Sequence, residues 1–95
     1  MYAVIRHYHF KPEDGGKIDK QVREEFVPLI KKGKGFVRYY WLDTGAGEGA
    51  SLSVFKDKAG ADESVQLAAD YVKAQLSKLL VQKPEVIEGE VKAHD

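Results

Sequence analysis

Two histidines and an arginine stand close together near the start of the chain, in the run Arg6, His7, Tyr8 and His9. Side chains two residues apart on a strand point the same way, so His7 and His9 share one face and Arg6 and Tyr8 the other. Histidine titrates near neutral pH and can serve as a general base. Two imidazoles can also share a metal ion, but the third ligand would have to be His94 or a surface carboxylate. We therefore predict no metal site, and the plain alternative is two polar residues at a strand end.

Arg6 needs a partner if it is buried, because an unpaired buried charge is costly. In the strand order predicted below, it meets Glu88 or Glu90 on one side and Ser51 and Ser53 on the other. Alternatively, its guanidinium grips the carboxylate or phenolate of a ligand through two parallel hydrogen bonds. The sequence leaves both roles open.

The segment 35–43, GFVRYYWLD, holds four aromatic residues in nine positions. As a strand it divides its side chains between two faces. One face carries Phe36, Arg38, Tyr40 and Leu42, and the other carries Val37, Tyr39, Trp41 and Asp43. Tyrosine and tryptophan serve equally in cores, in interfaces and as ligand platforms. Neither set of side chains is suited to bulk water, so a further layer is expected to cover the uncovered side.

The candidate ligand pocket combines these aromatic residues with polar side chains of the neighbouring strands. Its predicted members are Arg6, Tyr8, Tyr39, Trp41, Ser53 and Tyr71. Tyr71 belongs to the second helix, where it either closes the pocket or lies exposed. His7 and Arg6 are the catalytic candidates, although the chain shows no complete set of nucleophile, base and orienting residue.

Composition narrows the classes of function. The 95 residues are the size of one domain, predicted to span 1–95. The 15 basic and 15 acidic side chains cancel, which disfavours binding to nucleic acid or to an anionic membrane. The lack of cysteine excludes disulfides, thiolate catalysis and cysteine-ligated metal centres. No signal peptide or membrane span is recognisable, so a cytoplasmic location is expected.

Hydrophobic periodicity predicts six elements in the order β, α, β, β, α, β. Strands are expected at 2–10, 35–43, 50–57 and 85–91, and helices at 17–32 and 58–80. Right-handed crossovers place both helices on one face of a four-stranded antiparallel sheet, with the first strand between the third and the fourth. This is the α+β, ferredoxin-like βαββαβ arrangement. Its second face stays bare, and another copy of the chain is the simplest cover.

Three local signals refine this outline. Pro28 lies inside the first helical pattern and should loosen the last turn, because proline lacks a backbone N–H. Asp57 is placed to cap the second helix. The glycine-rich run 45–49 joins two strands and does not open a helix, so we interpret it as a hairpin turn and not as a phosphate-binding loop.

Several segments carry a family resemblance across nearly the whole chain. They are the opening strand MYAVIRHY, the helix end EEFVPLIKK, the strand GFVRYYWLD after a glycine, the junction SVFKDKAGADES and the closing PEVIEGEV. Together they resemble the antibiotic biosynthesis monooxygenase-like proteins of the dimeric α+β barrel superfamily. The resemblance implies a homodimer in which two sheets pack face to face, with a small cavity in each protomer. Members of this family include cofactor-independent oxygenases, haem-degrading enzymes and small proteins without an assigned activity.

Two functions follow as alternatives. The first is a dimeric protein that binds a small apolar or aromatic molecule without turnover. The second is a cofactor-independent monooxygenase for a small aromatic or quinone-like substrate, in which the substrate itself reduces oxygen and His7, Arg6 or a tyrosine handles the proton. No haem-ligand or catalytic pattern of the enzymes is matched residue by residue, so no cofactor is predicted.

Overall fold

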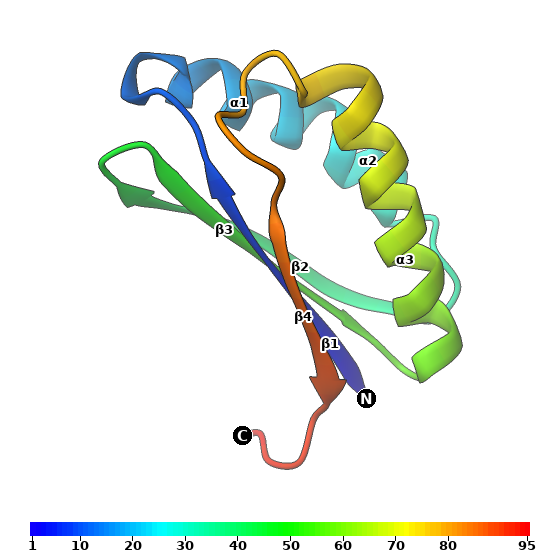
Figure 1. Ribbon diagram of the computed structural model, residues 1–95. Helices are drawn as coiled ribbons and strands as arrows, with labels where there is room; N and C mark the ends of the chain where they lie inside the picture. The colour runs from blue at the N-terminus through cyan, green and yellow to red at the C-terminus, as the bar shows by residue number, and fades with distance from the viewer.

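The computed structural model describes residues 1–95 and contains a single antiparallel sheet of four strands. The strands are β1 (Tyr2–His9), β2 (Phe36–Gly45), β3 (Glu48–Phe55) and β4 (Glu85–Glu90). Their order across the sheet is β2-β3-β1-β4. The predicted position of the first strand, between the third and the fourth, is therefore confirmed. All the helices lie on one side of this sheet, and no element covers the other side (Figure 1).

The first helical segment starts earlier than predicted and contains a wide turn. A 3₁₀ turn, η1 (Pro12–Asp14), leads into α1 (Gly15–Gln21), a π-helical turn η2 (Val22–Phe26) and α2 (Val27–Ile30). Gly15 and Gly16, expected in a loop, begin the helix because the 3₁₀ turn before them already sets a helical backbone. In the π turn the Val27 N–H donates to the Val22 carbonyl, five residues back. The loosening expected at Pro28 thus lies in the turn before it.

The second helical segment consists of α3 (Lys58–Tyr71) followed by a second π turn, η3 (Val72–Leu76). Asp57 caps it as predicted, since its Oδ1 accepts a hydrogen bond of 3.0 Å from the Gly60 N–H. The turn of the β2–β3 hairpin also depends on its residue types, because Ala46 and Gly47 both have positive φ. A Cβ atom at Gly47 would collide with the carbonyl oxygen of Phe10, so this turn needs a glycine.

The helix-covered face of the sheet holds the core. Val4, Ile18, Ile30 and Phe55 are the largest side chains with almost no exposed surface. They come from β1, α1, α2 and β3, so the core spans the whole interface between the two layers. Burial of this apolar surface is the main force that holds the helices to the sheet.

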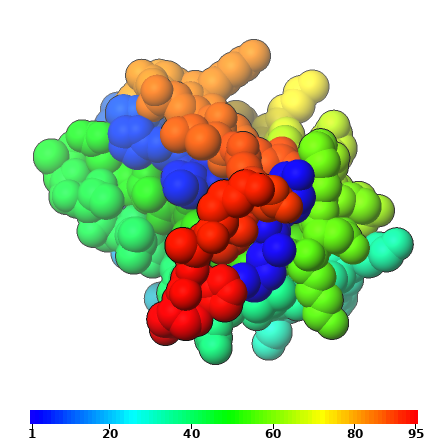
Figure 2. All heavy atoms as spheres, turned by 90° about the horizontal axis from the view of Figure 1, so that it is seen from below, coloured from blue at the N-terminus to red at the C-terminus, as the bar shows by residue number.

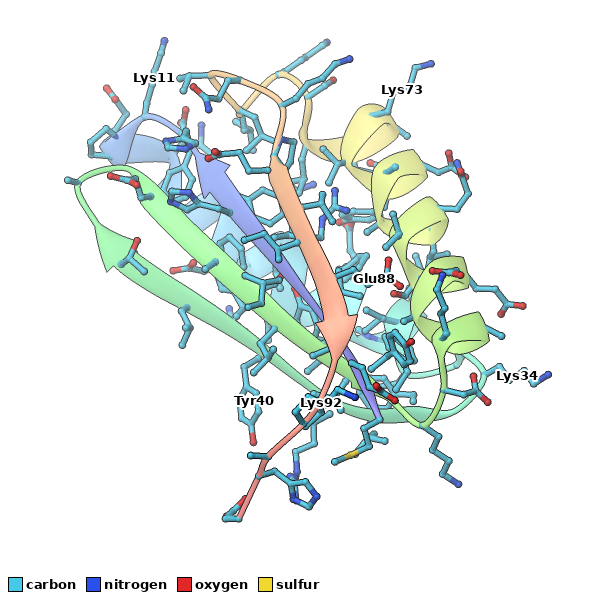
Figure 3. The ribbon with its side chains drawn as sticks, turned by 60° about the horizontal axis from the view of Figure 1, so that its bottom comes forward. Lys11, Lys34, Tyr40, Lys73, Glu88 and Lys92 are labelled. Atoms are coloured by element: carbon cyan, nitrogen blue, oxygen red, sulfur yellow. The ribbon has the colours of Figure 1, made fainter.

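The opposite, open face is also largely apolar, but it is exposed. Its large side chains include Ile5 (43 % exposed), Tyr40 (49 %), Leu42 (52 %) and Ile87 (67 %). Figure 3 shows Tyr40 pointing away from the helices, whereas Glu88 lies on the side of α3. We call this surface the open face.

A bulge in β2 changes which face of the sheet one of its side chains occupies, so one part of the predicted division is wrong. The pairing with β3 shifts between Phe36 and Arg38, so strict alternation is interrupted there. Phe36 consequently packs on the helix side, with its ring centre 6.0 Å from that of Phe55. The prediction that Phe36 shares a face with Tyr40 and Leu42 is therefore wrong.

The two ends of the chain lie together at one end of the sheet. The Val91 N–H donates a hydrogen bond of 2.8 Å to the Met1 carbonyl, and Figure 2 shows the last residues (red) beside the first ones (blue). No helix in the chain has the length and apolar character needed to cross a membrane.

Candidate functional site

Arg6 is the most unusual polar residue beneath the helices. Only 6 % of it is exposed, and its hydrogen bond runs from Nε to the Tyr8 hydroxyl oxygen at 2.9 Å. It faces Ser51 on β3 and Val86 on β4. The predicted pairing with Glu88 or Glu90 is wrong, because the observed register places those residues opposite Val4 and Tyr2.

Arg6 therefore has no carboxylate partner within the chain. Glu88 instead lies beside Asp62 of α3, and this contact raises the pKa of Glu88. A buried guanidinium without a counter-ion leaves open the second role considered for Arg6, in which it grips the carboxylate or phenolate of a ligand.

Tyr39 lies beside this arginine on the helix-covered face. Burial, together with the neighbouring Tyr8, raises its pKa well above the usual range, while the Ser51 hydroxyl and Arg6 act in the opposite direction. Its hydroxyl thus remains protonated at neutral pH and can donate a hydrogen bond. Ser53, its partner in the β2–β3 ladder, uses its own hydroxyl to donate to the Val4 carbonyl at 3.5 Å.

Trp41 connects the sheet to the first helix. Its indole N–H donates to Asp19 Oδ1 at 2.8 Å, and its ring meets Tyr8 edge-on with the centres 5.2 Å apart. The ring lies directly over Gly49, where a Cβ atom would come within 2.8 Å of it. Glycine at this position is what allows the large ring to lie flat against the sheet.

A groove of about 350 Å³ opens beside Tyr39 and Trp41, between the edge strand β2 and the first helical segment. Its walls are Asp19, Val22, Arg23, Val27, Tyr39, Trp41 and Asp43. Val22 and Val27 are the two residues joined by the hydrogen bond of the π turn, so this wide turn shapes the apolar wall that faces the aromatic one. A smaller hollow of about 250 Å³ between α2 and α3 contains none of the predicted site residues.

The predicted pocket residues divide between this groove and the layers behind it. Tyr39 and Trp41 line the groove, while Arg6, Tyr8 and Ser53 lie in the buried polar layer next to them. Tyr71 does not line the groove; its ring packs against Phe26, as that of Tyr39 does, and its hydroxyl donates to Glu25 at 2.8 Å. Burial and this carboxylate raise the pKa of Tyr71.

Three charged residues of the groove were missed by the sequence analysis. Asp19 and Arg23 are one helical turn apart, immediately after the core residues Ile18 and Val22. Their spacing beside the apolar stripe is the signal that places them at its border. Asp43, the third, ends the aromatic run on the same face as Trp41, as the predicted alternation indicates.

The histidines lie on the other side of the sheet. His7 and His9 point to the open face, where Glu48 of β3 and Glu85 of β4 contact them. Hydrogen bonds from His9 and His7 lower the pKa of Glu85. His7 and Arg6, the two catalytic candidates, therefore do not meet, because neighbouring residues of β1 face opposite ways.

The comparisons with known proteins were informative for structure alone. No family model matches the chain, and no curated protein matches its sequence. A protein of unknown function from Nitrosomonas europaea superposes with a TM-score of 0.84 at 21% identity, covering 99% of this chain and 91% of its own. A monooxygenase of Streptomyces coelicolor, solved with the ligand nanaomycin D, gives a TM-score of 0.80 at 11% identity over 99% and 89% of the two chains.

The fold is that of the antibiotic biosynthesis monooxygenase-like proteins. The resemblance drawn from the sequence is thereby confirmed for the fold. A third similar structure, described as a dimeric ferredoxin-like protein from an uncultured marine organism, has a TM-score of 0.76 at 13% identity and covers 100% of this chain and 98% of its own. Identities this low leave the activity undetermined.

Proposed function

We propose that this protein binds a small aromatic or apolar molecule in the groove between β2 and the first helical segment. The observation that carries this proposal is the make-up of the groove. Tyr39 and Trp41 form one wall, Val22 and Val27 the opposite one, and a few charged groups stand at the rim. The groove of about 350 Å³ combines four apolar or aromatic side chains with three charged ones, and such a mixture of apolar walls and a few polar groups is common in small-molecule sites.

The polar groups favour a phenol-like ligand. Its ring fits between the aromatic and the valine walls, and its hydroxyl is within reach of rim groups of both signs, Arg23 and Asp43. Behind the wall, the unpaired charge of Arg6 makes the site more favourable for an electron-rich ring or an acidic group. Arg6, which is hydrogen-bonded to Tyr8, thus acts through its positive charge to favour ligands of this kind.

Ligand-induced thermal stabilisation tests this function, since a ligand that binds only the folded state raises the melting temperature. A panel of phenols, hydroxyquinones and aromatic acids should contain compounds that stabilise the wild type. Val27→Trp fills the groove and should abolish the response, whereas Lys20→Trp, on an exposed part of α1, should keep it. Equal responses from these two variants, or no response from the wild type across the panel, would refute the proposed site.

We also propose that a second copy of the chain covers the open face. The exposed apolar side chains of this face, among them Leu42 and Ile87, form a surface that a small monomeric domain seldom leaves in water. The similar structure described as dimeric supports the same arrangement. Sedimentation at micromolar concentration should give about twice the chain mass of 10.6 kDa, and a stable monomer would contradict it.

A cofactor-independent monooxygenase is the alternative, favoured by the similarity to the Streptomyces coelicolor enzyme. In this chain His7 lies on the face opposite the groove, so the base at the groove would be Asp19 or Asp43. Oxygen uptake with hydroxyquinones or other electron-rich phenols that stabilise the protein separates the two functions. Uptake that Asp43→Asn slows without loss of binding supports catalysis, and stabilisation without uptake supports binding alone.

A further inference from the structure

Four side chains capable of binding a metal ion converge at one end of the open face. His7 and His9 come from β1, Glu48 from the start of β3 and Glu85 from the start of β4. The ladders hold them in place, because His9 is opposite Glu48 and His7 is opposite Glu85. This cluster lies outside the groove and is used by none of the functions proposed above.

Each of the two imidazoles lies close to both carboxylates. His7 Nε2 is 2.8 Å from Glu48 Oε1, and His7 Nδ1 is 3.1 Å from Glu85 Oε1. The same Glu85 oxygen is 3.1 Å from His9 Nε2, and Glu48 Oε1 is 4.0 Å from His9 Nδ1. Potential ligand atoms of His7, His9 and Glu48 all lie within 4.8 Å of one another. Small side-chain rotations would bring them to the separation of about 3.3 Å that ligands at 2.0–2.1 Å from a tetrahedral ion require.

Hydrogen bonding satisfies this arrangement only when both ring nitrogens of His7 carry a proton. A neutral imidazole has a single N–H, yet both ring nitrogens of His7 face carboxylate oxygens. With the neutral ring, one carboxylate therefore faces a nitrogen lone pair. A cation bound between that lone pair and the carboxylate turns the repulsion into coordination, while the remaining N–H donates to the second carboxylate.

We propose that His7, His9 and Glu48 bind a divalent transition-metal ion, with Zn²⁺ as the reference ion, and that Glu85 orients the imidazoles. Two imidazoles and one carboxylate suit zinc and its neighbours in the first transition row, whereas magnesium and calcium prefer oxygen ligands alone. A carboxylate that accepts the second N–H of a ligating histidine is a common partner in such sites. In the single chain the half-exposed position of the cluster leaves a coordination position open.

The site departs from the expectation drawn from the sequence, which had no definite third ligand. The carboxylates come from strands that follow His7 by 41 and 78 residues. Only the register of β3 and β4 against β1 brings them to the histidines. His94, the other ligand considered, lies in the C-terminal tail and contacts the backbone of Asp95.

Metal titration of tag-free protein tests the proposal. Calorimetry with Zn²⁺ and visible absorption with Co²⁺ should show one ion per chain, with bands of Co²⁺ bound to nitrogen ligands. His9→Ala and Glu48→Gln should each weaken Zn²⁺ binding at least 10-fold, and Glu85→Gln should weaken it by roughly 10-fold as loss of an orienting partner does. His94→Ala is the matched control and should bind as the wild type does.

Circular dichroism separates loss of the site from loss of the fold, and both carboxylate variants are conservative changes at exposed or half-exposed positions. Zn²⁺ should also raise the melting temperature of the wild type and leave that of His9→Ala unchanged. Absence of stoichiometric binding by the wild type, or binding that is retained in His9→Ala and lost in His94→Ala, would overturn the proposal.

Discussion

Strand β1 carries two polar clusters that differ in burial and in bonding partners, although their residues alternate along the strand. Arg6 and Tyr8 point beneath the helices, are buried, and bond to each other. His7 and His9 point to the open face, stay partly exposed, and meet two carboxylates. The buried cluster has a charge without a counter-ion, and the exposed one brings three imidazole nitrogens within 3.1 Å of two carboxylates. Each is therefore suited to a different partner, an electron-rich organic molecule in one case and a cation in the other.

The same contrast holds for the apolar residues of the two faces. Phe55 is fully buried under the helices, whereas Ile87 on the open face is 67 % exposed. One face is thus completed within the chain, and the other is the one that we propose a second copy covers. The comparison predicts that equivalent damage to the two faces will have different consequences, the first for folding and the second for association.

The largest effect is expected for Phe55→Ala. Removing this fully buried ring leaves a cavity and should lower the free energy of unfolding by about 3–5 kcal/mol. Chemical denaturation followed by circular dichroism measures the change. A loss below about 1 kcal/mol would mean that the layer between sheet and helices is not the core of the protein.

Ile87→Lys should leave the protomer folded and separate the proposed dimer. Lysine at this exposed position costs the single chain little, but in the dimer it places a charge in an apolar contact. Sedimentation should show the mass falling toward 10.6 kDa while the far-ultraviolet circular dichroism remains that of the wild type. Unchanged association would exclude the part of the open face around Ile87 from the interface.

Gly49→Ala should lower the free energy of unfolding by an intermediate amount, about 1–3 kcal/mol. The new methyl group would displace the Trp41 ring from above the sheet. The fluorescence of Trp41, the chain's single tryptophan, should change with it. Gly89→Ala provides the control, since nothing lies within 4 Å of the added atom there. Similar losses in both variants would show that the backbone, and not the tryptophan, responds to the substitution.

The smallest effect concerns the pH dependence at Tyr39. Its pKa is raised in the folded protein, so above a pH of about 10 the unfolded chain releases this proton while the native state keeps it. The free energy of unfolding should therefore fall as the pH rises beyond that point. In Tyr39→Phe the free energy of unfolding should fall less steeply with pH, by a slope that corresponds to about one proton. An identical slope in the two proteins would place the Tyr39 hydroxyl in contact with water.

Much of the fold was predictable from the sequence, and the site was predictable only in part. The element order, the place of β1 in the sheet and the Asp57 cap depend on periodicity and on local hydrogen bonding, which a single segment can reveal. The bulge after Phe36 and the opposition of Glu88 to Val4 depend on register between distant strands. A shift of one residue reverses the face of every side chain, so local patterns cannot assign cross-strand partners.

The indole N–H of Trp41 reports most directly whether a ligand binds in the groove. Because the chain has one tryptophan, its indole gives a single proton–nitrogen correlation in an NMR spectrum, reporting the hydrogen bond to Asp19. Titration with a phenol or hydroxyquinone that stabilises the protein should shift this signal in a saturable way, together with the amides of Val22 and Val27. A stabilising ligand that leaves the Trp41 signal in place and shifts only residues of the open face would contradict binding in the groove.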